Sequence, residues 1–255
     1  MSADHTQLVT HAAVPTLLAA SPLPLLALSQ ADIGRAVLFV LFLVMCVAVH
    51  EFGHAWVADR LGDPLPRQQG RVTLNPMAHA DLLGTILLPL VLAATGGQVL
   101  GWGKPVEWTG HPRYLTRRFS LRTMHLLVSV AGPAMNLLMA VLISAIIVLV
   151  ARLGHREILG PVLELGVGLV SMNLMLMFFN LLPVPPLDGR SFLYFLPDSF
   201  DRVRSFLFRY GGFIFLALVL TGPIYQGMSL LGLIMSPFAY LSGLFIQGVL
   251  LLALG

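Results

Sequence analysis

Apolar positions along the chain gather into long runs that short polar stretches separate. One run of 23 residues, Ala36–Ala58, holds a single carboxylate and two histidines, and at about 1.5 Å per helical residue it can cross a bilayer with some tilt. The other runs are Val14–Leu28, Leu82–Leu100, Leu126–Val150, Ile158–Leu182, Phe206–Leu220 and Ile224–Leu254. This pattern predicts an all-α polytopic membrane protein with about five to six transmembrane helices.

The polar stretches between the runs are rich in Gly, Pro and Arg, which indicates loops or surface segments. They cover residues 60–81, 101–122 and 183–210. Since no internal repeat or low-complexity tract interrupts the chain, we expect one integral membrane domain over residues 1–255. Its catalytic core would cover about residues 35–190, followed by C-terminal helices within 205–254.

Composition supports the membrane assignment. The chain is 57% hydrophobic and 11% charged, with a mean hydropathy of +0.85, which is outside the range of soluble proteins. The net charge is +3, but the 15 basic residues are scattered through loops without interleaved aromatic residues, so we expect no nucleic-acid partner. Cys46 is the single cysteine, which excludes a disulfide framework and a thiolate metal cluster. The N-terminal stretch lacks the basic region of a cleaved signal peptide.

The distribution of basic residues favours one topology. If every run from Ala36 to Leu182 crosses the membrane, 5 basic residues lie on one side and 10 on the other. If Leu82–Leu100 enters and leaves from the same side, the division becomes 3 and 12, which satisfies the positive-inside tendency better. Glycines and a proline within that run also suit a broken segment. The sequence therefore predicts a multi-pass protein of the cell membrane with a re-entrant segment at 82–100.

The clearest chemical signal is the H-E-x-x-H pattern of His50, Glu51 and His54 inside the first long run. On a helix, residues at i and i+4 lie on one face, where both imidazoles can bind one zinc ion with the glutamate beside them. Histidines that merely hydrogen-bond a neighbouring helix would account for one of them, but not for two at this spacing. The motif predicts a metallopeptidase with one Zn²⁺ per chain.

A catalytic zinc commonly has three protein ligands and an open fourth position, so a third donor is required. Only Glu164 and Asp188 lie within or at the end of a later apolar run. Asp188 follows several prolines, which end a helix and can present an aspartate toward a neighbour, although Asp-Gly after prolines is also typical of a plain turn.

Five motifs resemble the site-2 protease family of intramembrane zinc metallopeptidases, and in particular its compact bacterial members. These motifs are HEFGHAWVADRLGDP (50–64), RVTLNPMAHADLLGT (71–85), GWGKPV (101–106), AGPAMN (131–136) and NLLPVPPLDG (180–189). One departure is visible, because the family often has a second glycine where this chain has Arg190.

The resemblance implies roles for individual residues. His50, His54 and Asp188 match the zinc ligands of the family, Glu51 matches its catalytic glutamate, and Asn180 matches the asparagine that assists substrate or transition-state binding. It also implies an active site toward the cytosolic side. The expected reaction is hydrolysis of peptide bonds in or near transmembrane segments, so the expected partners are a transmembrane protein substrate and the lipid bilayer.

Two other functions compete with this one. A membrane-anchored protease of the gluzincin type would use Glu164 as its third ligand, and a zinc transporter or scaffold would leave Glu51 without a role.

Two further sets of residues have ordinary structural interpretations. Gly132, Pro133 and Asn136 are expected to serve close helix packing with a structural hydrogen bond. For His79, a capping or surface position is favoured over a role as an accessory polar group near the cleft.

Overall fold

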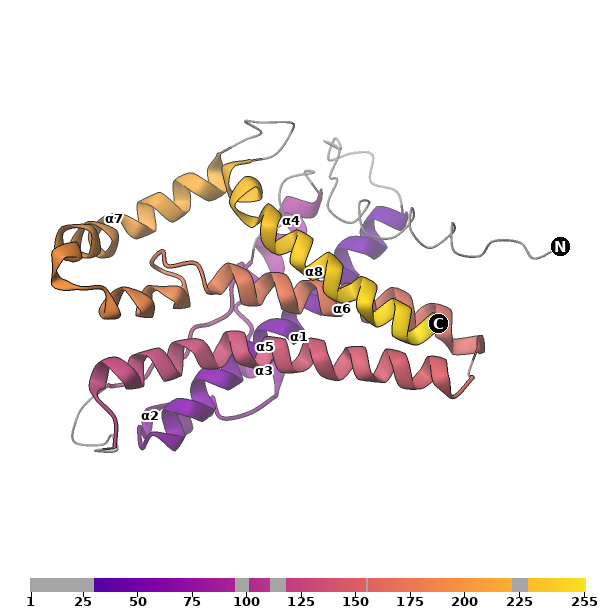
Figure 1. Cartoon of the computed structure of the whole chain (residues 1–255), viewed down its shortest axis with the longest axis horizontal. Helices are drawn as coiled ribbons and strands as arrows, with labels where there is room; N and C mark the ends of the chain where they lie inside the picture. Colours follow the sequence, from indigo (N-terminus) through magenta and orange to yellow (C-terminus); the bar gives the residue numbers. More distant parts are fainter. Residues whose placement is uncertain (1–29, 95–100, 111–117, 155, 222–228) are drawn as a thin grey trace. The chain divides into compact units, whose positions relative to one another are not determined.

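The computed structural model describes residues 30–94, 101–110, 118–154, 156–221 and 229–255. Over these residues every regular element is a helix, and five helices are long and apolar enough to span a membrane (Figure 1). They are α1 (Gln30–Arg60), α5 (Leu121–Arg152), α6 (Arg156–Asn180), α7 (Asp201–Leu220) and α8 (Leu230–Leu254). The prediction of an all-α polytopic membrane protein is confirmed. The candidate span Val14–Leu28 lies outside the described residues.

The helices begin where the sequence offers a cap. Ser120 Oγ accepts a hydrogen bond from Thr123 N at 3.2 Å at the start of α5, and Ser229 Oγ accepts one from Gly232 N at 3.1 Å at the start of α8. Each serine satisfies a main-chain donor that has no partner within the first helical turn. α7 begins at Asp201, five residues before the apolar run Phe206–Leu220. The apolar run does not include these residues because most of them are polar.

The chain divides into two compact units, residues 1–45 with 80–104 and residues 46–79 with 105–255. The single domain expected over 1–255 stays a prediction. In the first unit, the segment after Asp81 forms two short helices, η1 (Leu82–Leu87, 6 residues) and α4 (Leu88–Ala94, 7 residues). Together they extend about 20 Å, whereas the hydrocarbon core of a bilayer is about 30 Å thick. Residues 95–100 of the predicted re-entrant segment lie outside the described residues, so re-entry at 82–100 and the side from which the segment enters stay predictions.

A glycine organises this short-helix segment. Asp81 accepts a hydrogen bond from Gly84 N at 2.7 Å, and Trp102 N donates to Gly84 O at 3.0 Å. A Cβ atom at position 84 would lie 2.3 Å from the Trp102 indole, so only glycine allows the ring to lie there. Gly84 and Trp102 therefore connect the motif at 71–85 with the motif at 101–106.

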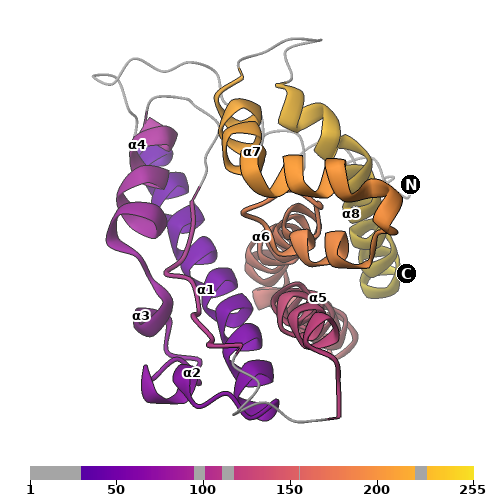
Figure 2. The ribbon, with the colours of Figure 1, turned by 90° about the vertical axis from the view of Figure 1, so that its left-hand side faces the viewer.

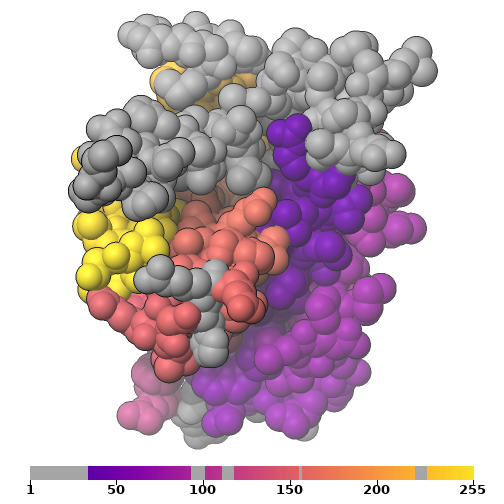
Figure 3. Space-filling model, turned by 90° about the vertical axis from the view of Figure 1, so that its right-hand side faces the viewer, coloured from indigo at the N-terminus to yellow at the C-terminus, as the bar shows by residue number. Residues whose placement is uncertain are grey.

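In the second unit, α5, α6 and α8 pack side by side (Figures 1 and 2). A Cβ at Gly166 of α6 would lie 2.8 Å from Ile147 Cδ1 of α5, so this glycine permits a close helix approach. The end of α8 lies against the end of α5 and the start of α6 (Figure 3). The buried core of this bundle consists of Ala140, Ile147, Val170, Leu174, Met177, Ile246, Val249 and Ala253.

The second unit also contains short polar helices that follow the long ones. These are α2 (Leu65–Gln68), α3 (Pro76–His79), η2 (Asp188–Phe195) and η3 (Asp198–Phe200). Asp63 lies between α1 and α2 and is fully buried. Its Oδ2 accepts hydrogen bonds from Thr109 N at 2.6 Å and from Gly110 N at 3.1 Å, so it fixes that extended segment against the end of α1.

The interpretation of His79 as a capping or surface residue is wrong. His79 is fully buried, and its Nε2 lies 2.8 Å from Thr73 O. Burial lowers the pKa of His79, and the hydrogen bond to Thr73 offsets only part of this effect. Arg71 donates to Ala78 O beside it and to Pro105 O. The loop after α1 is therefore a packed structure around polar side chains.

Candidate metal centre

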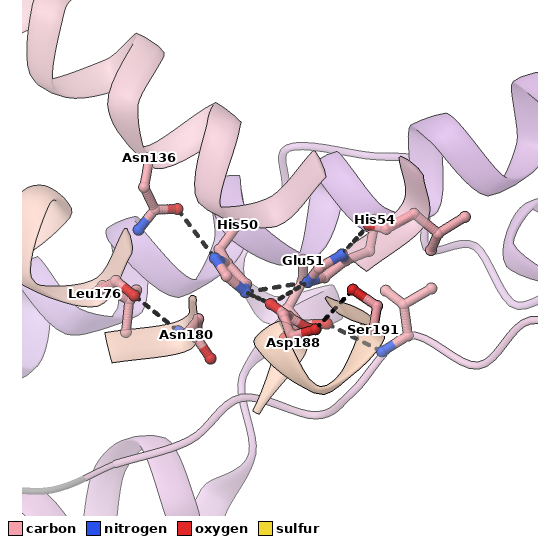
Figure 4. Close-up of polar contacts among 10 residues, drawn as sticks. His50, Glu51, His54, Asn136, Leu176, Asn180, Asp188 and Ser191 are labelled. Atoms are coloured by element: carbon pink, nitrogen blue, oxygen red, sulfur yellow. Dashed lines mark hydrogen bonds and ion pairs between the residues drawn. The ribbon is translucent and has the colours of Figure 1, made fainter. Parts of the chain in front are cut away.

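His50 and His54 lie one helical turn apart on a buried face of α1 (Figure 4). Their Nε2 atoms are 3.0 Å apart, and the ring planes are nearly perpendicular at 84°. Gly53 explains how this face of α1 comes so near α5, because a Cβ there would lie 2.6 Å from Ala131 O. The helix therefore brings two imidazole nitrogens to one point, as the i, i+4 spacing predicts.

Asp188 reaches the histidines from a distant part of the chain. α6 ends at Asn180, and Asp188 begins η2 after a turn that contains three prolines. Its Oδ2 lies 3.0 Å from His50 Nε2 and 3.1 Å from His54 Nε2 (Figure 4). The structure thus brings together the two histidines and the aspartate, whereas Glu164, the other candidate, is exposed on α6.

The turn before Asp188 depends on one glycine. A Cβ at Gly189 would lie 2.3 Å from Leu181 O and from Leu182 O, so the chain can fold back onto the end of α6 only with glycine there. Arg190, where the family often has a second glycine, is exposed. Despite this departure from the family pattern, Asp188 reaches both histidines.

The second nitrogen of each imidazole has an acceptor. His54 Nδ1 lies 2.7 Å from Val128 O, and His50 Nδ1 lies 3.2 Å from Asn136 Oδ1. Because a carbonyl or amide oxygen only accepts, each Nδ1 carries the hydrogen and each Nε2 presents a lone pair. Such partners orient histidine ligands in metalloproteins.

This arrangement fits a metal ion. Two Nε2 lone pairs and the Oδ2 of Asp188 face one another at 3.0–3.1 Å, and three acceptors at that distance repel one another unless a cation lies among them. Ligand atoms about 2.0–2.2 Å from a tetrahedral zinc are separated by about 3.3–3.6 Å, close to the distances seen here. Two imidazoles and a carboxylate, with a fourth position left over, are a donor set typical of catalytic zinc.

Glu51 lies beside this group. One possible metal-ligand atom from each of His50, Glu51 and His54 lies within 4.8 Å of the other two. Glu51 Oε2 accepts a hydrogen bond from Val106 N at 3.0 Å, and this contact orients the carboxylate. No hydrogen bond from another described residue reaches its other oxygen, Oε1.

Asn180 lies at the end of α6, near the group but not bonded to it. Its Nδ2 donates to Leu176 O of its own helix at 2.9 Å (Figure 4). Among the described residues, no hydrogen bond joins Asn180 to the histidines, to Glu51 or to Asp188. A continuous helix from Asn180 to Asp188 would place them two turns apart, but the helix ends at Asn180 itself.

One stripe of α5 supports both histidines and was not recognised from the sequence as part of the site. Val128, Gly132 and Asn136 follow one another at intervals of four residues, so they share a face of the helix. A Cβ at Gly132 would lie 2.4 Å from His54 Nε2 and 2.7 Å from His50 Cε1, so glycine provides the space for both rings. The AGPAMN motif signalled Gly132 and Asn136, whereas a main-chain acceptor such as Val128 O leaves no trace in a sequence.

Comparison with known proteins finds relatives named as zinc metalloproteases. The chain is 36% identical over 192 residues to YwhC of Bacillus subtilis, whose name describes it provisionally as a zinc metalloprotease, and the match covers 71% of this chain and 80% of YwhC. Two proteins named Rip2, with the same provisional description, match 157 residues. The one from Mycolicibacterium smegmatis is 31% identical, and the one from Mycobacterium tuberculosis (strain H37Rv) is 32% identical.

These Rip2 matches cover 62% and 61% of this chain, and 56% of each Rip2 protein. No family profile and no solved structure matches the chain. The extent and identity of the YwhC match show that the chain belongs to the site-2 protease family of zinc metalloproteases.

Proposed function

We propose that the protein is an intramembrane zinc metalloprotease that hydrolyses peptide bonds in or near transmembrane segments of membrane-protein substrates. One Zn²⁺ per chain would be held by His50 Nε2, His54 Nε2 and Asp188 Oδ2. The observation that carries this proposal is that Asp188 Oδ2 from η2 meets the two Nε2 atoms of α1 beside the Glu51 carboxylate, and that α1 is long and apolar enough to span a membrane. Buried ionisable groups in such a helix are costly and usually functional.

Glu51 is the general base and then the general acid. When bound, zinc supplies Lewis acidity that polarises the scissile carbonyl and lowers the pKa of water. Glu51 Oε1, the oxygen that Val106 N does not bind, accepts the proton of the attacking water and delivers it to the leaving amine. The hydrogen bond from Val106 N keeps the carboxylate in one orientation, which favours transfer along a single path.

Asn180 is the proposed donor to the developing oxyanion. One hydrogen of its Nδ2 is bound to Leu176 O, and an amide nitrogen carries two, so the second remains for a substrate oxygen. Its place at the end of α6, just before the turn that leads to Asp188, supports this role.

The membrane setting determines the substrate class. A protein substrate would enter from the bilayer, and its helix must unwind locally because helical carbonyls are hydrogen-bonded and shielded. We propose that the protein lies in the cell membrane with its active site toward the cytosolic side, which the 3-to-12 division of basic residues supports.

Replacement of Glu51 tests this proposal. Glu51→Gln should leave zinc bound while cleavage disappears, so membrane proteins that are substrates should accumulate in cells that carry this variant. Glu107→Gln is the matched control, because Glu107 is an exposed carboxylate on the segment that contacts Glu51. Undiminished cleavage by the Glu51→Gln protein would refute the mechanism. If the unaltered protein cleaves no membrane protein, zinc transport into vesicles becomes the next measurement.

A further inference from the structure

The two histidines differ in what holds their rings. His54 Nδ1 donates to a main-chain oxygen, Val128 O, at 2.7 Å, and no side-chain replacement at that position removes this acceptor. His50 Nδ1 donates to a side chain, Asn136 Oδ1, at 3.2 Å. The orientation of His50 therefore depends on a single amide group.

The amide of Asn136 has one polar contact among the described residues. Asn136 is fully buried in α5, and its Nδ2 has no hydrogen-bond partner in the described part of the chain. Figure 4 shows Oδ1 directed toward His50 and Nδ2 directed away from it. An unpaired buried donor costs free energy, and an apolar side chain of similar size would avoid that cost. The oxygen that faces His50 is the part of the residue that makes a contact.

We infer that Asn136 is a positioning residue of the metal centre. By accepting the Nδ1 hydrogen of His50, its Oδ1 holds the imidazole in the tautomer whose Nε2 lone pair faces His54 and Asp188. This inference rests on the proposed function, because it assigns Asn136 to the binding of the metal. It replaces the interpretation of Asn136 as a residue that only stabilises helix packing.

Zinc affinity, measured on the purified full-length protein by competition with a chromogenic chelator, tests the inference. Asn136→Leu removes the acceptor while keeping the branched shape and the number of side-chain heavy atoms, and it should weaken zinc binding by about 10- to 100-fold. Asn136→Asp keeps an acceptor oxygen and replaces the unpaired nitrogen with the second oxygen of a carboxylate. Carboxylates are common partners of metal-bound histidines, so the zinc affinity of this variant should stay close to that of the unaltered protein. Asn173→Leu is the matched control, since Asn173 is also buried and its Nδ2 binds only Leu169 O of its own helix.

Each outcome separates the inference from the proposed function. Zinc affinity in Asn136→Leu equal to that of the unaltered protein would overturn the inference alone. If Asn136→Leu does not fold, Asn136→Asp decides, and a folded aspartate variant that has lost zinc affinity would overturn the inference. Absence of zinc binding by the unaltered protein would overturn both. Loss of affinity in Asn173→Leu as large as that in Asn136→Leu would reduce Asn136 to a packing role.

Discussion

The two halves of α5 contribute differently to the protein. The first half faces α1, where Val128 O and Asn136 Oδ1 each accept a hydrogen bond from an imidazole and Gly132 leaves the space for both rings. The second half faces α6 and α8, where Ala140 and Ile147 belong to an apolar core. Both halves are parts of one continuous apolar helix, so hydropathy alone does not distinguish them.

This comparison shows why substitutions should act differently along α5. Dispersion contacts in the bundle are individually weak and can adjust, because a side chain that changes rotamer finds other neighbours. Each imidazole of the metal centre is held at Nδ1 by a hydrogen bond, and the proposed zinc would bind Nε2, so neither ring can move without losing a contact. Changes in the first half should affect metal binding, and changes in the second half should affect stability.

The largest effect is expected at Asp188. Asp188→Asn removes the negative charge that faces the two imidazoles, so zinc affinity should fall by more than the 10- to 100-fold expected at Asn136, and cleavage should become undetectable. Metal analysis of the purified protein and a cleavage assay measure both effects. Asp198→Asn, an exposed aspartate in the same region, serves as the control. Full zinc occupancy in Asp188→Asn would remove Asp188 from the ligand set.

A pair of glycines gives the sharpest comparison between the two halves. Gly132→Ala should abolish zinc binding, because the new Cβ would lie 2.4 Å from His54 Nε2, and that ring is fixed. Gly166→Ala places a Cβ 2.8 Å from Ile147 Cδ1, the end of a flexible side chain, so it should cost about 1–3 kcal/mol of stability without loss of zinc. Zinc affinity and thermal unfolding of both variants check this. Equal losses of zinc would contradict the division of α5.

The smallest effect on the site is expected from the bundle core. Ile147→Ala removes packing that α5 shares with α6 and α8, and buried Ile→Ala changes cost about 2–5 kcal/mol in water-soluble proteins. The lower end of that range is expected here, because lipid tails are as apolar as the protein interior. Thermal unfolding in detergent should therefore occur at a lower temperature, with unchanged zinc affinity in the folded protein. A zinc affinity that falls with stability would mean that the two halves are coupled.

Much of the fold follows from the sequence. Apolar runs identify the long helices, since a bilayer requires helical segments of sufficient length. Gly84 and Pro89 predict a break in the apolar run after Asp81, and the structure has two short helices there. The apolar run predicts that α6 ends at Leu182, two residues beyond its end at Asn180, because Leu181 and Leu182 are apolar but lie in the turn that Gly189 closes. Burial of His79 was missed because its neighbours in the fold come from separate loops.

The spacing of residues in the sequence predicts only part of the site. H-E-x-x-H places two histidines on one helical face, and Asp188 follows from the need for a third donor together with the resemblance to the family. The supporting groups could not be found in this way. The acceptor Val128 O belongs to the main chain, and Gly132 matters for the space that it leaves.

The central claim is that two imidazoles and one carboxylate bind a single zinc ion. X-ray absorption spectroscopy at the zinc edge of the Glu51→Gln protein tests it directly. The expected result is one zinc per chain with nitrogen and oxygen donors at about 2.0–2.2 Å and the scattering pattern of two imidazoles. A sulfur donor at about 2.3 Å would contradict the account and implicate Cys46, the only cysteine, which is buried one turn before His50. A protein that binds no zinc would contradict it as well.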